Sequence, residues 1–388
     1  MIQKEKDIII QESASYLDEI YEHTEYKIKY VKKYVENWLY VITNFDNVKN
    51  INFIDCMCNA GIYKNGVLGT PIEVLRLFIE FSIEHPEKKF NLFLNDSDLN
   101  RIRIIQKICN LFNYRNYKNL NIYFTNLDVN AYLEKLVKST SYFGNNGYNQ
   151  LSSTILFVDP YCFGEVKIKN IKNFTDTFYS ELIFNYFNSD YRRNIDNTST
   201  PAKRQKIIDS MDGILGFNPN MNEKQVEELI QQSIKGKHIK HSFSYPFRIK
   251  TNVELYHIIY ATPNPKGLIK IKESLWDVFN GDAFFKNGNG RDQLSLFDDS
   301  EFKEMNVQNF SKEAQELLCK MFNSKTVDYQ TISEFVLEHT MLKDSHIINN
   351  LLNPLIEQEK IIKNNTKSKR NYKNDTYTFI KVENYKKI

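Results

Sequence analysis

The sequence predicts an α/β fold, a doubly wound and mostly parallel sheet, followed by a C-terminal winged helix–turn–helix. Two observations carry this prediction. In the longer N-terminal part, short apolar runs alternate with stretches whose apolar residues have helical spacing. Near the C-terminus, three helical stretches precede two strand-like runs that flank a basic, polar segment. We expect a sheet domain over residues 1–285, a linker over 286–307 and the winged helix–turn–helix over 308–388.

The expected sheet domain begins with a polar leader and a helical stretch at 23–45. The expected strands cover 51–58, 91–98, 121–128, 153–161 and 181–189. A helical stretch follows each of the first four strands, and the segment 246–279 adds a last strand and a helix that complete the domain. This alternation favours parallel pairing, with ligands bound outside the carboxyl ends of the strands.

The composition restricts the classes of function. The chain has 388 residues, is 41% hydrophobic and 26% charged, and carries a net charge of +3. Binding to nucleic acid must therefore come from local basic patches and not from an overall positive charge. The five cysteines have scattered spacings and no C-x-x-C, so we expect reduced thiols and no metal site. No signal peptide or membrane-length apolar run occurs, so a cytoplasmic location away from membranes is expected.

Acidic residues stand at the ends of three successive predicted strands. Asp55 ends the first strand, and Gly61 lies in the turn that follows it. Asp96 and Asp98 end the second strand, and Asp128 ends the third. A nucleotide-like cofactor needs a loop that allows close approach, a carboxylate for the ribose and a polar group for the base. The sequence therefore predicts a cofactor cleft here, although strand-ending aspartates that only cap the following helices are an open alternative.

Several segments together resemble one protein family. HTEYK, FIDCMCNAGIYKNGVLGTP, LFLNDSD, LFVDPYCFG and LYHIIYATPNPKGL are similar to segments of the three-Cys-motif partner (TcmP) family. The resemblance implies a Rossmann-like class I methyltransferase sheet, a C-terminal winged helix and S-adenosylmethionine as cofactor. It also implies that His23 and Lys27, one helical turn apart, abut the cofactor loop, and that a neighbouring three-Cys-motif protein is a partner. The chain departs from the family at Asn59, where the family has glycine, and this leaves a variant site or a degenerate one.

The fourth predicted strand ends in Asp159-Pro160-Tyr161. Amino-methyltransferases carry a similar Asp/Asn-Pro-Pro-aromatic tetrapeptide, in which oxygen atoms accept the N–H groups of a base amine and the aromatic ring stacks on the base. Asp159 and Tyr161 are therefore the candidate catalytic residues, and Asn185 at the end of the next strand is similarly placed for substrate. Only one proline is present here, so a strand-end turn that merely shapes the pocket is the alternative.

The expected linker contains the pentapeptide QLSLF, which looks like a bacterial sliding-clamp-binding peptide. The residues expected to bind the clamp are Gln293, Leu294, Leu296 and Phe297. Leucine and phenylalanine side chains would enter an apolar pocket of the clamp, while the glutamine would bond at its rim. The alternative is an apolar staple that packs the linker back onto a domain.

The tip of the expected wing is basic. Its cations are Lys367, Lys369, Arg370 and Lys373. Spaced cations on a hairpin suit contacts to phosphates, so DNA is the expected partner, and protein pairing is the alternative.

Two functions remain open from the sequence. The first is an S-adenosylmethionine-dependent methyltransferase that acts on or alongside DNA. The second is a non-catalytic, DNA-associated adaptor of a modification, repair or defence system, with a degenerate cofactor site.

The pentapeptide yields a direct test. Replacing Leu296 and Phe297 together by alanine should abolish co-purification of the chain with the bacterial sliding clamp, because both apolar anchors are lost. A pull-down with the purified clamp measures this. Unchanged capture of the double variant would exclude the pentapeptide as the binding segment.

Overall fold

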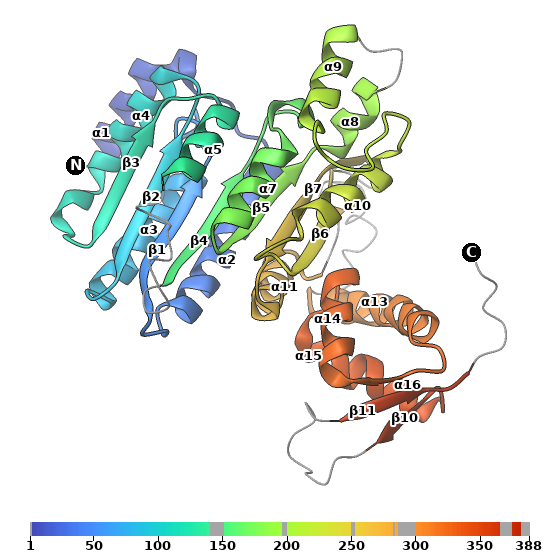
Figure 1. The fold of residues 1–388 in the computed structure, drawn as a ribbon. Coiled ribbons are helices and arrows are strands. Elements are labelled where there is room, and N and C mark those ends of the chain that lie inside the picture. Colours follow the sequence, from blue (N-terminus) through green and yellow to red (C-terminus); the bar gives the residue numbers. More distant parts are fainter. Residues whose placement is uncertain are drawn as a thin grey trace. The chain divides into compact units, whose positions relative to one another are not determined.

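A computed structural model describes residues 2–139, 151–195, 200–249, 253–281, 284–285, 299–364 and 375–381 (Figure 1). The chain forms two compact units, Met1–Gly267 and Leu268–Ile388. Among the helices of these described ranges, none is long and apolar enough to cross a bilayer.

The first unit is an α/β structure built on a sheet. Its strands are β1 (Val48–Asp55), β2 (Lys89–Asn95), β3 (Leu120–Thr125), β4 (Leu151–Val158), β5 (Ser180–Tyr186), β6 (His241–Ile249) and β7 (Val253–Thr262). Its α-helices are α1 (Ile2–Ser13), α2 (Glu22–Ile42), α3 (Thr70–Glu84), α4 (Leu99–Leu111), α5 (Val129–Lys138), α7 (Ile168–Thr177), α8 (Asn188–Ile195), α9 (Pro201–Ser210) and α10 (Glu223–Ile234). Short 3-10 turns lie at η1 (Ala14–Tyr16), η2 (Tyr114–Asn116) and η3 (Phe163–Glu165).

The strands of this unit run in the order β3-β2-β1-β4-β5-β7-β6. Strands β1 to β5 pair in parallel, and β7 is antiparallel to both β5 and β6. Helices α5 and α7 lie in front of the sheet in Figure 1, and α2 and α3 lie behind it. The predicted α/β class and its mostly parallel sheet are confirmed.

Burial on both faces explains the apolar strands. In β1, Ile51, Phe53 and Ile54 are fully buried although successive side chains point to opposite faces. One large core, which includes Ile54 and Phe174, lies between the sheet and the α5–α7 face.

A ladder of polar side chains fixes the register of four parallel strands. Asn121 donates to Asn91 (3.0 Å), Asn91 donates to Asn52 (2.9 Å), and Asn52 donates to the Thr154 hydroxyl (3.0 Å). These residues are also direct register partners in β3, β2, β1 and β4. Because a slip of one strand by one residue would leave buried amides unpaired, the ladder selects this register over its neighbours.

The second unit contains helices and a small antiparallel sheet. Its elements are most of α11 (Pro265–Phe279), then β8 (Phe284–Phe285), α13 (Asp299–Met321), β9 (Thr326–Asp328), α14 (Tyr329–His339), α15 (Asp344–His346), η4 (Ile347–Leu352), α16 (Asn353–Glu357), β10 (Ile361–Asn364) and β11 (Thr376–Phe379). Strand β11 pairs antiparallel with both β10 and β9. A separate core forms around Leu318, Ile332 and Leu351.

Two boundaries differ from those expected. Helix α11, which we expected to complete the sheet domain, lies largely in the second unit. Its Trp276 explains this, because the indole N–H donates to the carbonyl oxygen of Met341 (2.8 Å) and the ring meets His346 edge-on. Helix α13 begins at Asp299, so part of the expected linker over 286–307 is helical.

The polar ladder yields a stability prediction. Replacing Asn91 by alanine should lower the free energy of unfolding by about 1–3 kcal/mol, because amide groups of Asn52 and Asn121 lose their buried partner. Urea denaturation measures this as a lower midpoint. The exposed Asn220, replaced by alanine, is the control and should shift stability by less than about 0.5 kcal/mol. Equal midpoints for the two variants would contradict the role given to the ladder.

Candidate functional site

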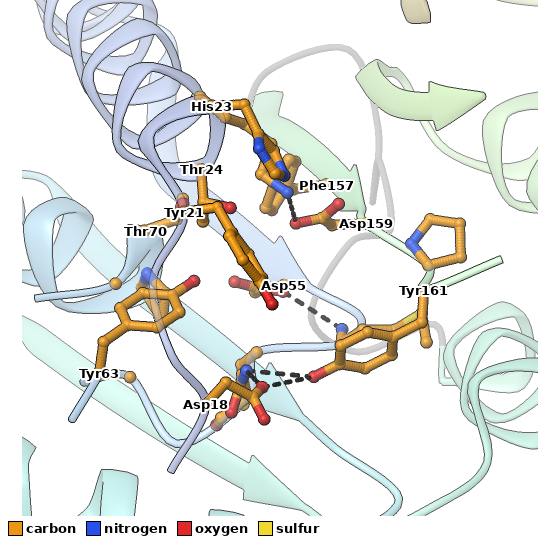
Figure 2. A pocket seen from close by; sticks show the side chains of 18 of the residues that line it. Asp18, Tyr21, His23, Thr24, Asp55, Tyr63, Thr70, Phe157, Asp159 and Tyr161 are labelled. Carbon is orange, nitrogen blue, oxygen red and sulfur yellow. Dashed lines mark hydrogen bonds and ion pairs between the residues drawn. The ribbon is translucent and has the colours of Figure 1, made fainter. Parts of the chain in front are cut away.

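A cavity of about 410 Å³ opens at the carboxyl ends of β1 and β4 (Figure 2). These are adjacent strands at which the strand order reverses, and ligands of open α/β sheets bind at such a point. The start of α2, the loop after β1 and the end of β4 supply its walls, with His23, Asp55 and Asp159 among the lining residues. We call it the first cavity.

Asp55 lies at the base of the first cavity and is only 1% exposed. Its carboxylate accepts the backbone N–H of Met57 (3.2 Å). Burial raises the pKa of Asp55 well above its ordinary value of 3.8, and the nearby carboxylates of Asp159 and Asp96 raise it further, while the Met57 N–H and Lys27 oppose the shift. A buried carboxylate with so little compensation favours a cationic ligand group.

The loop after β1 needs residues that tolerate a left-handed backbone. Gly61 has φ +71°, and a Cβ there would lie 2.8 Å from the Ile105 side chain. Gly69 donates its N–H to the Gly61 carbonyl (2.8 Å), which closes the loop on itself. Asn59 also has positive φ (56°), a left-handed conformation that asparagine adopts more readily than most residues other than glycine.

The side chain of Asn59 lies on the wall of the first cavity. Its backbone N–H donates to Asp96 (3.0 Å), and its amide donates to Asp18 (2.6 Å) and to the Tyr161 hydroxyl (3.1 Å). The side chain is therefore held at the wall by Asp18, a residue from the segment before α2.

A second cavity of about 350 Å³ is lined by Asp96 and Asp128, together with Met57, Leu127 and Tyr161. Asp96 accepts the backbone N–H groups of Asn59 and Asp98 with different oxygens, and burial raises its pKa. We call this space the second cavity.

Asp98 and Asp128 act as helix caps. Asp98 accepts the N–H of Asn100 at the start of α4 (2.8 Å), and Asp128 accepts the N–H of Asn130 at the start of α5 (2.9 Å). Asp128 lines the second cavity as well, whereas Asp98 lines neither cavity. The structure thus brings Asp55, Asp96 and Asp128 to one edge of the sheet and leaves Asp98 with its capping role.

Tyr161 stands between the two cavities and lines both. Its hydroxyl contacts Asn59, Asp18 and the guanidinium of Arg101, and Arg101 also pairs with Asp18 (3.1 Å). We call these four residues, Asp18, Asn59, Arg101 and Tyr161, the Asp18 cluster. The cluster holds the hydroxyl of Tyr161 in place, and the ring of this residue lines both cavities.

Both carboxylate oxygens of Asp159 are bonded within the chain. Lys27 Nζ lies 2.5 Å from Oδ2, and the Asn185 amide donates to Oδ1. His23 and Lys27 line the same cavity as Asp55 and Gly61. The pKa of His23 is lowered by burial and by Lys27, against the opposing effect of Asp159, so its imidazole is neutral at neutral pH.

Sequence reasoning missed several residues of the site. They are Asp18, Tyr21, Tyr63, Arg101, Phe187 and Tyr256. Asp18 and Tyr21 lie in the stretch interpreted as a polar leader, and Tyr256 lies inside an apolar strand, where nothing in the pattern marks it.

The expected clamp-binding and wing residues lie outside the described residues. These are Gln293, Leu294, Leu296 and Phe297, and Lys367, Lys369, Arg370 and Lys373. In the β10–β11 hairpin, the described Lys363 pairs with the buried Asp375 (2.8 Å).

No protein-family model matches this chain, and no curated protein matches it. The case for a function therefore depends on the geometry of the site.

Asp55 gives a prediction about pH. Its folded pKa lies above the unfolded value, so the stability that this group contributes is present below about pH 3.8 and is lost as the pH rises through the folded pKa. Asp55→Asn should therefore be more stable than the wild type at pH 8, by on the order of 1 kcal/mol or more, with the difference shrinking toward pH 4. Urea denaturation at both pH values measures this.

The exposed Asp46, replaced by asparagine, is the matched control and should show no such trend. A variant Asp55→Asn that loses stability relative to the wild type as the pH rises would show that the carboxylate is compensated.

Proposed function

We propose that the first unit is an S-adenosylmethionine-dependent methyltransferase. The observation that carries the proposal is the cavity at the reversal of strand order, with buried carboxylates at the ends of β1 and β2 and the partly exposed Asp159 after β4. S-adenosylmethionine carries two cationic groups, a sulfonium and an ammonium, together with a ribose diol and a flat base. Each of these has a complementary group along this edge of the sheet.

The donor set fits the cofactor. Asp55 suits the cationic groups in the first cavity, and Asp96 suits the ribose hydroxyls. A carboxylate has about four lone-pair sites, so Asp96 retains acceptor capacity beside its two backbone bonds. Asp128 and the apolar Met57 and Leu127 suit the base in the second cavity. When bound, the cofactor would supply an electrophilic methyl group.

The strand order gives independent support. An antiparallel β7 between β5 and β6 extends a sheet whose other neighbours run β3-β2-β1-β4-β5. Class I methyltransferases share this arrangement, so the topology agrees with the resemblance noted in the sequence.

The chain's own residues would orient the reactants. Asp55 is fixed by the Met57 N–H and by burial, and Asp96 holds the loop through Asn59. Bonds within the chain hold these groups in position, which favours alignment of reacting atoms. Asp159, bonded to Lys27 and Asn185, would meet an acceptor amine only after one of these bonds yields.

A second function is favoured by one observation. Tyr161 lines both cavities, and its hydroxyl is held by Asp18, Asn59 and Arg101. We infer that a ligand spanning both cavities would have to displace this ring. If it does not move, the site is degenerate and the chain is a non-catalytic, DNA-associated adaptor.

We also propose that the second unit is a winged helix–turn–helix that contacts DNA. Helices followed by an antiparallel hairpin, β10 and β11, joined by the basic segment 365–374, support this. The pairing of β9 with β11 gives the small sheet expected at the base of a wing. The sliding clamp and a neighbouring three-Cys-motif protein remain proposed partners.

Calorimetric titration with S-adenosylmethionine tests the enzyme. The wild type should bind, and Asp55→Ala and Asp96→Ala should each abolish binding, because each removes a carboxylate from a cavity. Asp98→Ala is the matched control: it should cost about 1 kcal/mol of stability through the lost cap and leave the affinity unchanged. A wild type that does not bind millimolar cofactor would contradict the enzyme and favour the adaptor.

A further inference from the structure

Aromatic rings form one end of the first cavity. Tyr256 on β7 lies against Phe187, with ring centroids 5.2 Å apart, and meets His23 edge-on at 6.5 Å. All three line the cavity, and we call them the aromatic compartment. Phe247 on β6 stacks on Tyr256 at 4.9 Å and supports it from behind.

The hydroxyl of Tyr256 is unusual within this compartment. Tyr256 is 1% exposed, and no described residue makes a hydrogen bond to its buried hydroxyl. Leaving a buried hydroxyl unpaired costs about 1–3 kcal/mol, so nearly all such groups have partners. A residue that lines a cavity and keeps an unpaired hydroxyl is suited to a ligand that supplies the missing partner.

Two further groups face the same space. Lys27 Nζ lies 5.7 Å from the centroid of the Tyr256 ring while it pairs with Asp159. His23 makes ring contacts, but among the described residues none makes a hydrogen bond to its imidazole. A neutral imidazole without a partner is able to accept a proton.

We propose that the aromatic compartment binds the methyl acceptor, and that this acceptor is a flat heteroaromatic ring with a polar edge. The inference rests on the proposed function and specifies its substrate class. A flat ring gains by stacking against aromatic side chains, and its polar edge completes the bonding of the Tyr256 hydroxyl. An aliphatic acceptor would leave that hydroxyl unpaired or make poor use of the rings.

The geometry also indicates which residue takes the proton that the acceptor loses on methylation. An exocyclic amino nitrogen on the acceptor ring forms the new bond to the methyl carbon as the carbon–sulfur bond breaks, and the electron pair of the broken bond stays on sulfur. The acceptor nitrogen then loses its proton to the His23 imidazole, which releases it to water. Asp159, whose oxygens are already bonded, orients Lys27 in this arrangement.

Two sources supply such a ring: a base of a nucleic-acid strand and a free nucleoside. The probes are therefore a single-stranded DNA oligonucleotide containing 2-aminopurine and the free 2-aminopurine riboside. Stacking quenches the fluorescence of this base, so binding to the full-length chain is read directly. Quenching of the oligonucleotide alone identifies a nucleic-acid acceptor, and quenching of the riboside alone identifies a small-molecule acceptor.

The decisive variant is Tyr256→Phe, which keeps the ring and removes the hydroxyl. We expect probe affinity to fall about two- to tenfold, with the quenched emission of the complex retained. The thermal midpoint should stay equal or rise, because an unpaired buried hydroxyl is removed. The exposed Tyr40 on α2, replaced by phenylalanine, is the control and should change neither quantity.

The outcomes separate this inference from the proposed function. S-adenosylmethionine binding is titrated for the same proteins and should not change in Tyr256→Phe. Cofactor binding without binding of either probe overturns the aromatic compartment alone, and probe binding without cofactor binding overturns the methyltransferase alone. A lower midpoint in Tyr256→Phe, or unchanged probe affinity, would show that the hydroxyl has no ligand role.

Discussion

The site depends on the burial of carboxylates at one edge of a parallel sheet. Asp55, Asp96 and Asp159 lie near one another there, and burial raises the pKa of the first two. Charges of one sign in a low-dielectric environment repel each other and lose hydration, so they persist only with compensation. Lys27 compensates Asp159, and backbone N–H groups compensate the other two only in part. The charges of Asp55 and Asp96 therefore remain only partly compensated within the chain.

The buried carboxylates also fix the backbone of the loop after β1. The Asp96 carboxylate accepts the N–H of Asn59, and this bond ties the end of β2 to the loop after β1. Gly61 permits the sharp turn because a side chain there would collide with Ile105. The segment before α2 then adds Asp18, which neutralises Arg101 and holds the Asn59 amide. Residues far apart in the sequence thus form one electrostatic unit.

Much of the fold could be predicted from the sequence because the spacing of apolar residues indicates which side chains are buried. The strands of the sheet were visible as apolar runs, since both faces are covered. The candidate cavity residues Asp55, Gly61, Asp96 and Asp159 were visible because strand ends and turns follow from that pattern. From the sequence, capping a helix and lining a cavity were alternatives for Asp128, whereas in the structure this residue does both.

The remainder could not be predicted, for physical reasons. Asp18 and Arg101 reach the site through long-range packing, which leaves no local signal. Whether the Tyr256 hydroxyl is paired depends on three-dimensional contacts. The apolar pattern of β7 is the same whether or not that hydroxyl has a partner, so the sequence gives no sign of it. The boundary at α11 was misplaced because an amphipathic helix does not reveal which neighbour covers its apolar face.

The position of Tyr161 has a consequence for how the two cavities behave together. Its ring is a shared wall, so an occupant of either cavity that displaces it alters the free energy of filling the other. Thermodynamic linkage requires this influence to be mutual and equal in size for the two binding equilibria. The bonds of the Asp18 cluster would have to break in any such displacement, so their strength would limit how strongly one cavity could influence the other.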